Sequence, residues 1–342
     1  MSNSNYQVMQ RLIYSLPEQL KEGWQIGTDC QLAGAGHFEN VVIAGMGGSA
    51  IGGDVVRSLL FNDGYLPVLV WRDYILPSVV DNRTVLFAIS YSGNTEETLS
   101  VYEQAKDKCG QLVVITSGGE LVVKAKRDGV PVLKIAGGMP PRCAIGLVSV
   151  PILAVLYQLG ITRSYQRDVN ETALVIAHNC QQWHRRGRQI SRMLCDRLPV
   201  VYSTSRLLDA VAYRWQCQLN ENAKVMCHSG FLPEQSHNEL MGFGSPNFLD
   251  KMFFLVFLLD STTSQRTRVR LNQMLKLIGD TIAGKALVKS QGRSPMARLF
   301  SAVVMGDLTS LELAKLRDVD PIEIPRIERL KQVLNRTKRY KI

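Results

Sequence analysis

The 342-residue sequence lacks the signatures of several protein classes. Its seven cysteines are odd in number and include no Cys-x-x-Cys pair, which argues against a disulfide framework and against a zinc ribbon. Its five histidines form no His-x-x-Glu or His-x-His cluster, so we expect no metal site. The first residues show no basic start followed by an apolar run, and the apolar run at 252–259 is far shorter than a membrane span. These absences predict a cytoplasmic protein that does not associate with a membrane.

Acidic residues are fewer than basic ones: the chain has 30 Asp and Glu and 40 Lys and Arg, which gives a net charge of +10. Residues 329–342 hold six basic and no acidic residues (+6), and residues 182–197 hold five arginines and one aspartate (+4), so the rest sums to about zero. Neither stretch has the interleaved aromatic residues of a base-stacking platform. We therefore expect solvated helix faces and a basic tail, and no nucleic-acid partner.

The first half alternates short apolar runs with amphipathic stretches, and the length predicts two domains. Runs of this kind are typical of a parallel sheet covered by helices on both faces. The sequence therefore predicts a helical segment over 1–35 and a doubly wound α/β domain over 36–162. The strands are expected at 40–45, 67–71, 84–90, 111–116 and 131–135.

The second half repeats this pattern after a polar, basic stretch at 165–197. An apolar run at 199–203 precedes a helical pattern at 206–219, and another at 253–259 enters a Ser/Thr-rich turn and a helix ending near Ile278. We therefore predict a second α/β domain over 163–331, followed by a basic tail over 332–342. Because doubly wound domains bind ligands beyond the carboxyl ends of their strands, the expected site is a cleft between the two halves.

Two segments that link a strand to a helix carry the chemistry of the first domain. Gly-Met-Gly-Gly-Ser-Ala-Ile-Gly-Gly at 45–53 suits an anion at a helix N-terminus, and it also fits a dinucleotide fingerprint or a plain tight turn. Ser-Tyr-Ser-Gly-Asn-Thr at 90–95 adds three hydroxyl groups, of which simple helix capping would use one. Hydroxyls and helix N-terminal amides together suit a compact phosphomonoester better than a dinucleotide pyrophosphate.

These two motifs resemble the substrate-phosphate loops of sugar isomerase (SIS) domains, and among these the bifunctional phosphoglucose/phosphomannose isomerases. The resemblance runs from about residue 40 to 331, although Ala50 stands where the family commonly has glycine. It implies two tandem SIS domains, each a flavodoxin-like, doubly wound parallel sheet. The substrate phosphate would then bind Gly47, Gly48, Ser49, Ser90, Ser92 and Thr95.

Four further residues match catalytic positions of the family. Isomerisation of an aldose to a ketose needs a base that carries a proton between C1 and C2, and a group that opens the sugar ring. Glu221 in Asn-Glu-Asn-Ala-Lys resembles the family's base, and His237 in Ser-His-Asn-Glu resembles its ring-opening acid/base. Arg142, after two prolines, resembles the active-site arginine, and Lys331 resembles the lysine that helps ring opening or binds sugar oxygens. Nearby, Glu234 and Glu239 are alternative carboxylates, and we expect His228 to be structural.

The resemblance implies an isomerase that interconverts glucose 6-phosphate, and mannose 6-phosphate, with fructose 6-phosphate through a cis-enediol. It further implies a homodimer in which His237 serves the site of the other subunit, and no cofactor. Two other functions stay open on the sequence. One is a sugar-phosphate sensor without catalysis, because SIS domains also occur in transcriptional regulators, although no helix-turn-helix module is visible here. The other is a dinucleotide-dependent oxidoreductase, which the second phosphate turn disfavours.

Overall fold

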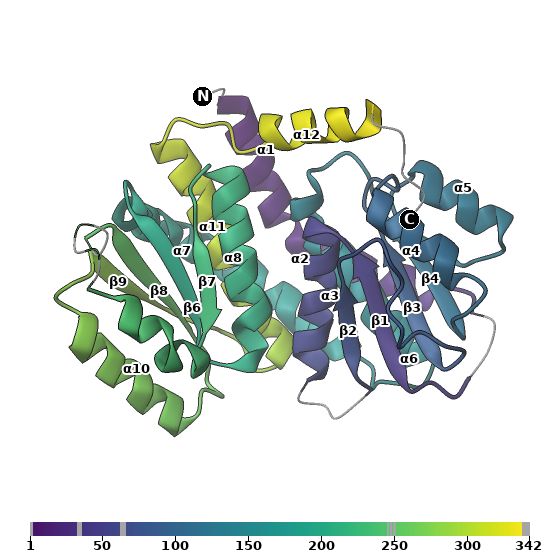
Figure 1. The fold of residues 1–342 in the computed structure, drawn as a ribbon, viewed down its shortest axis with the longest axis horizontal. Helices are drawn as coiled ribbons and strands as arrows, with labels where there is room; N and C mark the ends of the chain where they lie inside the picture. Colours follow the sequence, from purple (N-terminus) through teal and green to yellow (C-terminus); the bar gives the residue numbers. More distant parts are fainter. Residues whose placement is uncertain are drawn as a thin grey trace.

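The computed structural model describes residues 3–32, 36–61, 66–244, 246, 248 and 251–336. It contains two parallel β-sheets that stand side by side, each with helices on both faces (Figure 1). Within these described residues, no helix is both long and apolar enough to cross a bilayer. The predicted fold class, two doubly wound α/β units, is confirmed.

The first sheet has the strand order β2-β1-β3-β4-β5, which is the flavodoxin-like order. The register places Gly45 beside Ile89, so the turns that follow β1 and β3 start at the same level of one sheet edge. Its strands are β1 (Asn40–Gly45), β2 (Val68–Trp71), β3 (Thr84–Ile89), β4 (Gln111–Thr116) and β5 (Val132–Lys134). Its helices are α3 (Gly47–Leu60), α4 (Glu96–Ala105), α5 (Gly119–Arg127), η1 (Pro141–Cys143) and α6 (Ile145–Gln158).

The second sheet repeats this order with one strand fewer, as β7-β6-β8-β9. Its strands are β6 (Leu198–Ser203), β7 (His228–Phe231), β8 (Phe253–Leu259) and β9 (Gly284–Lys289). Its helices are η2 (Arg206–Leu208), α8 (Asp209–Asn222), η3 (Glu234–His237), η4 (Glu239–Gly242), α10 (Gln265–Ile278) and α11 (Pro295–Leu316). β9 was not recognised in the sequence, because its alternating Gly-Lys-Ala-Leu-Val-Lys pattern is short and buries only two side chains.

Successive side chains of a strand belong to different hydrophobic cores, as expected for a sheet that is covered by helices on both faces. In β1, Val41 and Ile43 belong to the large central core, while Val42 and Ala44 face α4 and α5. In the second sheet, Val200 and Tyr202 share the core with α10. The central core is continuous between the two sheets, which joins the two domains through apolar packing.

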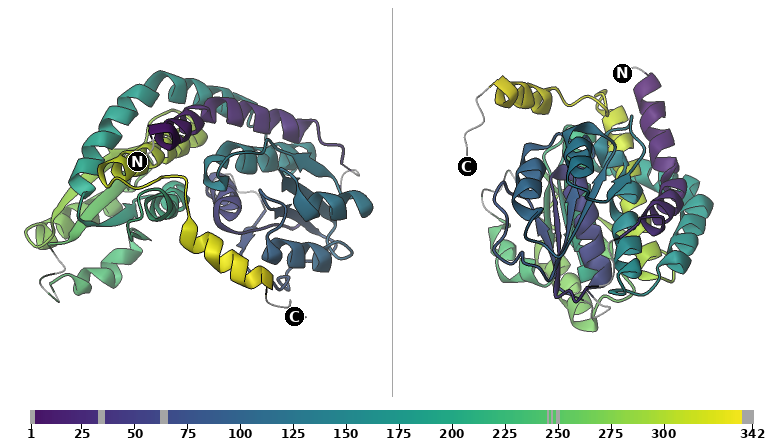
Figure 2. Two further views of the ribbon diagram at one scale, coloured as in Figure 1. Left: turned by 90° about the horizontal axis from the view of Figure 1, so that it is seen from above. Right: turned by 90° about the vertical axis from the view of Figure 1, so that its right-hand side faces the viewer.

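Three long segments outside the sheets build this shared core. α2 (Leu16–Thr28) packs on α6 behind the first sheet, α1 (Asn3–Tyr14) packs mainly on α11, and α7 (Gln166–Leu194) runs along the back of the molecule (Figure 2). The basic stretch at 165–197 therefore contains one 29-residue helix. Its apolar face, including Trp183 and Ile190, is buried against α11, while Arg185 and Arg192 face solvent. The charge excess of this stretch thus lies on a solvated helix face.

The last described helix, α12 (Pro325–Arg336), stands apart from both sheets (Figures 1 and 2). Its side chains from Arg326 through Leu334 are exposed. They include four large apolar residues, Ile327, Leu330, Val333 and Leu334, which are between 40% and 59% exposed. The spacing of three, four and seven residues places them on one side of the helix, which leaves an apolar face open on this chain.

Candidate active site

The turn between β1 and α3 brings backbone amides to the sheet edge. Gly47 has φ +50°, in the left-handed region that favours glycine, and it opens α3. A Cβ on Gly48 would lie 3.1 Å from the carbonyl oxygen of Pro141 and 3.2 Å from the amide nitrogen of Arg142. The missing side chain at Gly48 therefore lets the turn pack directly on η1, which carries the predicted arginine.

The turn between β3 and α4 supplies hydroxyl groups beside the first turn. The Ser90 hydroxyl donates to Thr95 Oγ1 at 2.8 Å and accepts from the Gly93 amide at 3.0 Å. The Tyr91 amide donates to Ser49 Oγ at 3.3 Å, which links the two turns. Ser90 and Ser49 are buried, whereas Ser92 is exposed. The structure thus brings all six predicted phosphate-binding residues, Gly47, Gly48, Ser49, Ser90, Ser92 and Thr95, to two adjoining turns at one sheet edge.

Arg142 joins the first domain to the second. The residue is 4% exposed, and its Nη1 atom lies 3.2 Å from Oε2 of Glu221 at the end of α8. Its Nε donates to Asn222 Oδ1 at 2.7 Å. Its Nη2 donates to the carbonyl oxygens of Pro321 at 2.6 Å and Ile322 at 3.0 Å. Four of the five guanidinium hydrogens are therefore used within the chain, and the fifth lies on Nη1, the nitrogen that holds Glu221.

Glu221 occupies the last turn of α8, and about a quarter of its side chain, 28%, is exposed. Its neighbour Asn222 is buried and donates through Nδ2 to Ser310 Oγ of α11 at 2.9 Å, which fixes the end of the helix. A carboxylate that is partly shielded from water and paired with a guanidinium can accept a proton from a bound substrate. Arg142 and Glu221 therefore form a compact polar pair next to the two turns that are predicted to bind phosphate.

His237 lies away from this pair within one chain. It is exposed at the end of η3, which follows β7, and the register pairs Phe231 of β7 with Ser203 of β6. His237 therefore lies at the sheet edge where α8 begins, whereas Glu221 lies where α8 ends. The helix has 14 residues, and at 1.5 Å per residue it is about 20 Å long.

Lys331 is exposed on α12, the helix that stands apart from both sheets. The segment that leads to α12 is nevertheless anchored at the site, through the Arg142 contacts with Pro321 and Ile322. The alternative carboxylates have other contacts. Glu239 accepts from Tyr202 Oη at 2.6 Å and lies 3.5 Å from Nε2 of His228, whose side chain is exposed.

The structure also involves residues to which the sequence gave no function. Lys224 Nζ donates to the carbonyl oxygens of Asp320 at 2.8 Å and Glu323 at 2.7 Å, and to that of Glu221. The Asp320 carboxylate accepts from the amide of Ile322 at 2.7 Å. Both residues belong to motifs that the sequence singles out, Asn-Glu-Asn-Ala-Lys and Asp-Pro. Their spacing could not show that the two motifs meet.

Several ionisable groups around the pair have shifted pKa values. Burial, followed by the charge of Arg142, lowers the pKa of Lys224. Burial raises the pKa of the Cys143 thiol to about 12, so this cysteine stays protonated beside the arginine and cannot act as a thiolate nucleophile. Among the described residues, no group of three or more His, Cys, Asp and Glu side chains is arranged to hold a metal ion.

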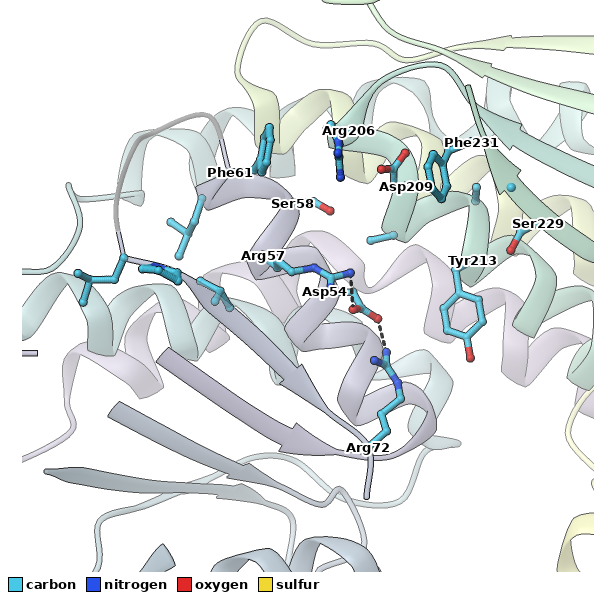
Figure 3. Close-up of a pocket in the computed structure, with 17 residues that line it drawn as sticks. Asp54, Arg57, Ser58, Phe61, Arg72, Arg206, Asp209, Tyr213, Ser229 and Phe231 are labelled. Atoms are coloured by element: carbon cyan, nitrogen blue, oxygen red, sulfur yellow. Dashed lines mark hydrogen bonds and ion pairs between the residues drawn. The ribbon is translucent and has the colours of Figure 1, made fainter. Parts of the chain in front are cut away.

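A separate cavity of about 820 Å³ opens between α3 and α8 (Figure 3). Asp54 points into it and accepts from Arg57 at 3.0 Å and from Arg72 on the other side. Arg206 and Tyr213 line it from the second domain. None of the ten site residues predicted from the sequence belongs to its lining. This cavity is therefore distinct from the arrangement around Arg142 and Glu221.

Comparisons with protein families divide the chain into two matched regions. Residues 37–136 match the SIS domain, and residues 184–334 match the bacterial phospho-glucose isomerase C-terminal SIS domain. The first region contains both phosphate turns, and the second contains Glu221, His237 and Lys331. The chain thus has two SIS domains, and Arg142 lies between the matched regions.

Curated relatives extend over nearly the whole chain. A bifunctional phosphoglucose/phosphomannose isomerase of Caldicellulosiruptor bescii is 36% identical over 330 residues, which cover 94% of this chain and 97% of the relative. One from Thermoplasma acidophilum is 36% identical over 300 residues, covering 87% and 90%. Among solved structures, the C-terminal domain of glucosamine-fructose-6-phosphate aminotransferase from Francisella tularensis superposes with a TM-score of 0.72 at 16% identity, covering 92% of this chain and 98% of that one. That last likeness concerns the fold alone.

Proposed function

The chain belongs to the family of bifunctional phosphoglucose/phosphomannose isomerases, and on this premise we propose that it interconverts glucose 6-phosphate and mannose 6-phosphate with fructose 6-phosphate. The observation that carries the proposal is the contact between Arg142 and Glu221 beside the Gly48 turn. This contact brings together Glu221, a candidate base from the second domain, and Arg142, a cation that packs on the candidate phosphate-binding turn of the first domain. A sugar-phosphate sensor would need the phosphate-binding turns, but it would give no reason for the pairing of buried Arg142 with partly shielded Glu221.

The phosphate group is proposed to bind the two turns of the first domain. The α3 and α4 helices begin at these turns, so their unpaired amides and the positive ends of their dipoles favour a dianion. Ser49, Ser90, Ser92 and Thr95 add hydroxyl donors, while Gly47 and Gly48 allow the phosphate oxygens to approach the backbone. No lysine or arginine lies in either turn, so specificity for phosphate would come from directed neutral donors.

Glu221 is proposed to carry the proton between C1 and C2 of the open-chain sugar. Removing the proton gives a cis-enediol(ate) with negative charge developing on an oxygen atom; a proton then passes between the oxygen atoms of C1 and C2, and returning the first proton to the other carbon completes the isomerisation. Arg142 would stabilise that charge with the remaining Nη1 hydrogen. Its other four hydrogens are tied to fixed oxygens, so the guanidinium is oriented before substrate binds. The reaction transfers a proton within the substrate and requires no redox cofactor.

Ring opening is proposed to use His237 of a second subunit, with Lys331 assisting. The length of α8 separates His237 from Glu221 of the same chain, so a shared site in a homodimer accounts for both residues. The exposed apolar face of α12 supports such an association, because contiguous exposed apolar residues commonly mark protein interfaces.

We also propose that residues 36–162 and 163–331 are the two domain units, with 1–35 as a helical addition and 332–342 as a basic tail. Each proposed unit contains one complete parallel sheet. Residues 337–342 of the tail lie outside the described residues. A place in glycolysis and gluconeogenesis in the cytoplasm would follow from the proposed substrates.

The proposed activity is tested with fructose 6-phosphate in coupled assays that detect glucose 6-phosphate and mannose 6-phosphate separately. We expect both products to form. Protection against heat by fructose 6-phosphate without formation of either product would favour the sensor, whereas protection by NAD would favour the oxidoreductase. Glucose 6-phosphate alone would restrict the activity to one aldose.

The shared site is tested by mixing two inactive variants, Glu221→Gln and His237→Ala, after reversible dissociation. Random pairing gives half heterodimers with one intact site each, so activity should recover to about a quarter of the wild-type value. As a control, mixing Glu221→Gln with Arg142→Met should restore nothing, since both residues belong to one chain's half-site. Equal recovery in both mixtures, or in neither, would contradict the proposed sharing.

A further inference from the structure

Lys224 has no role in the reaction proposed above, yet its conformation is unusual. Its φ is +56°, and it follows α8, directly after the Ala223 cap. Glycine is favoured at this position because a side chain strains a left-handed backbone. A lysine here therefore suggests that its side chain makes a compensating contribution.

That contribution is visible in its hydrogen bonds. An ammonium group has three hydrogens, and Lys224 directs them to three carbonyl oxygens. One belongs to Glu221 in the last turn of α8, and the others belong to Asp320 and Glu323. The cation thus caps the negative end of α8 and attaches a distant segment to it.

The attached segment is a turn, residues 320–323, that is held at every carbonyl oxygen. Lys224 binds those of Asp320 and Glu323, and Arg142 binds those of Pro321 and Ile322. The Asp320 carboxylate closes the turn by accepting from the amides of Ile322 and Glu323 at 2.7 and 3.2 Å, and from Asn5 Nδ2 at 2.6 Å. The turn is therefore fixed on two cations and on α1.

The turn determines where α12 starts, because that helix begins at Pro325. Its side chains from Arg326 through Leu334 are exposed, so packing within this chain contributes little to its position. Lys331 lies six residues after the helix start, about 9 Å along the axis. A displacement of the turn would consequently move Lys331 relative to Glu221.

We propose that Lys224 is a positioning residue of the isomerase: it fastens the 320–323 turn to the end of α8 and so aligns Lys331 with the Arg142–Glu221 pair. Its three hydrogens are all bound to carbonyl oxygens, so it transfers no proton to the substrate itself. This inference rests on the proposed function. It adds to that function a residue that acts through backbone carbonyls.

The kinetic test compares Lys224→Met with wild type. Methionine keeps the length of the side chain and removes the donors. We expect kcat for fructose 6-phosphate to fall about 10- to 100-fold, as misplacement of a catalytic group by about 1 Å can do. KM should change less than about twofold, because the phosphate turns are not altered. Lys276→Met, which removes an exposed lysine of α10, is the matched control and should leave both constants unchanged.

A double-mutant comparison shows whether the effect passes through α12. In a Lys331→Met background, Lys224→Met should lower kcat by less than about twofold, because the group that it positions is already gone. The same 10- to 100-fold loss in both backgrounds would overturn the proposal. An unchanged kcat in the wild-type background, or a loss confined to KM, would overturn it as well.

Hydrogen exchange tests the attachment without any assay of activity. In Lys224→Met, amides of residues 320–336 should exchange at least about tenfold faster, while the strands keep their protection. Lys224→Gly removes the side chain and relieves the backbone strain, so it covers the case in which the methionine variant does not fold. Unchanged exchange of 320–336 in either folded variant rejects the attachment. A wild-type protein without isomerase activity would instead reject the proposed function.

Discussion

The two domains share a strand order but end the equivalent strands differently. β3 of the first domain is followed directly by Ser90, whose hydroxyl bonds to Thr95 and to neighbouring amides. β8 of the second domain is followed directly by Asp260, a buried carboxylate that accepts from Ser290 Oγ at 2.6 Å and from Arg298 Nε at 2.9 Å. The turn after β3 thus presents neutral hydrogen-bond donors. The turn after β8 instead contains a negatively charged side chain, the Asp260 carboxylate, which is bound by donors of the same domain. Two domains with the same fold can therefore differ in role: the charge of one residue can suit one turn to binding an anion and the equivalent turn to stabilising the structure.

In the proposed reaction, the second domain would contribute from another place. Glu221 and Lys224 lie at the C-terminal end of α8, away from the sheet edge that corresponds to the two glycine- and serine-containing turns of the first domain. In the first domain, the start of the corresponding helix, at Gly47, faces the site. One domain thus offers a helix N-terminus, where anions are favoured, and the other offers a C-terminus, where the cations Arg142 and Lys224 gather.

The largest effect on kcat is expected from replacing Glu221, the residue of the second domain that is proposed to act as the base. Glu221→Gln removes proton transfer but leaves the phosphate turns intact, so kcat should fall about 10²- to 10⁴-fold with KM little changed. Steady-state kinetics with fructose 6-phosphate measure this. Glu18→Gln, an exposed carboxylate of α2, is the matched control. Near-normal turnover in the Glu221 variant would rule out its assignment as the base.

Placing a carboxylate in the first domain, at the position equivalent to Asp260 of the second domain, should strongly weaken phosphate binding. Ser90→Asp places a carboxylate where the phosphate is proposed to bind, and like charges about 4 Å apart at an intermediate dielectric repel by about 4 kcal/mol. We expect kcat/KM to fall about 10²- to 10³-fold, mostly through KM. Ser261→Asp, in the equivalent turn of the second domain, should change neither constant. If both variants kept wild-type KM, the phosphate would have to bind elsewhere.

The reverse change should affect stability alone. Asp260→Asn leaves Arg298, whose side chain is 12% exposed, without its carboxylate, so unfolding by urea should show a loss of about 3 kcal/mol. KM for fructose 6-phosphate should remain at the wild-type value. Asp280→Asn, at an exposed turn of the same domain, is the control. A large rise in KM for the Asp260 variant would show that the second domain also binds substrate.

The smallest effect concerns acid stability of the second domain's helices. Burial alone would raise the pKa of Glu312, but hydrogen bonds from His184, Arg188 and Tyr6 lower it to about 2. This group binds fewer protons folded than unfolded, so its stabilisation is complete above pH 4.5 and is lost as pH falls toward 2. The shift corresponds to about 3 kcal/mol at most. Stability should therefore decline less steeply between pH 4.5 and 2 in Glu312→Gln, and an identical decline would contradict this account.

Local patterns in the sequence were sufficient for most of the architecture. The strand at 40–45 matches β1 in full, and the run at 253–259 matches β8. Continuous apolar runs show a buried parallel strand because both of its faces need cover. The motifs at 45–53 and 90–95 indicated anion binding because glycines and hydroxyls before a helix expose directed donors. The buried helix in the stretch at 165–197 was harder to predict, because the many arginines of this stretch obscure the apolar face of α7 in the sequence.

The sequence by itself determined the fold class, and it located the two turns that are proposed to bind phosphate and the residue types that isomerisation would need, since each depends on neighbours within a few positions along the chain. Only the tertiary structure decided which of these residues meet. It brought Arg142 to Glu221 across 79 positions, attached the 320–323 turn to Lys224, and kept His237 at the far end of α8. The physical reason is that such contacts depend on how two separately formed sheets pack through one shared core, and no local pattern encodes that packing.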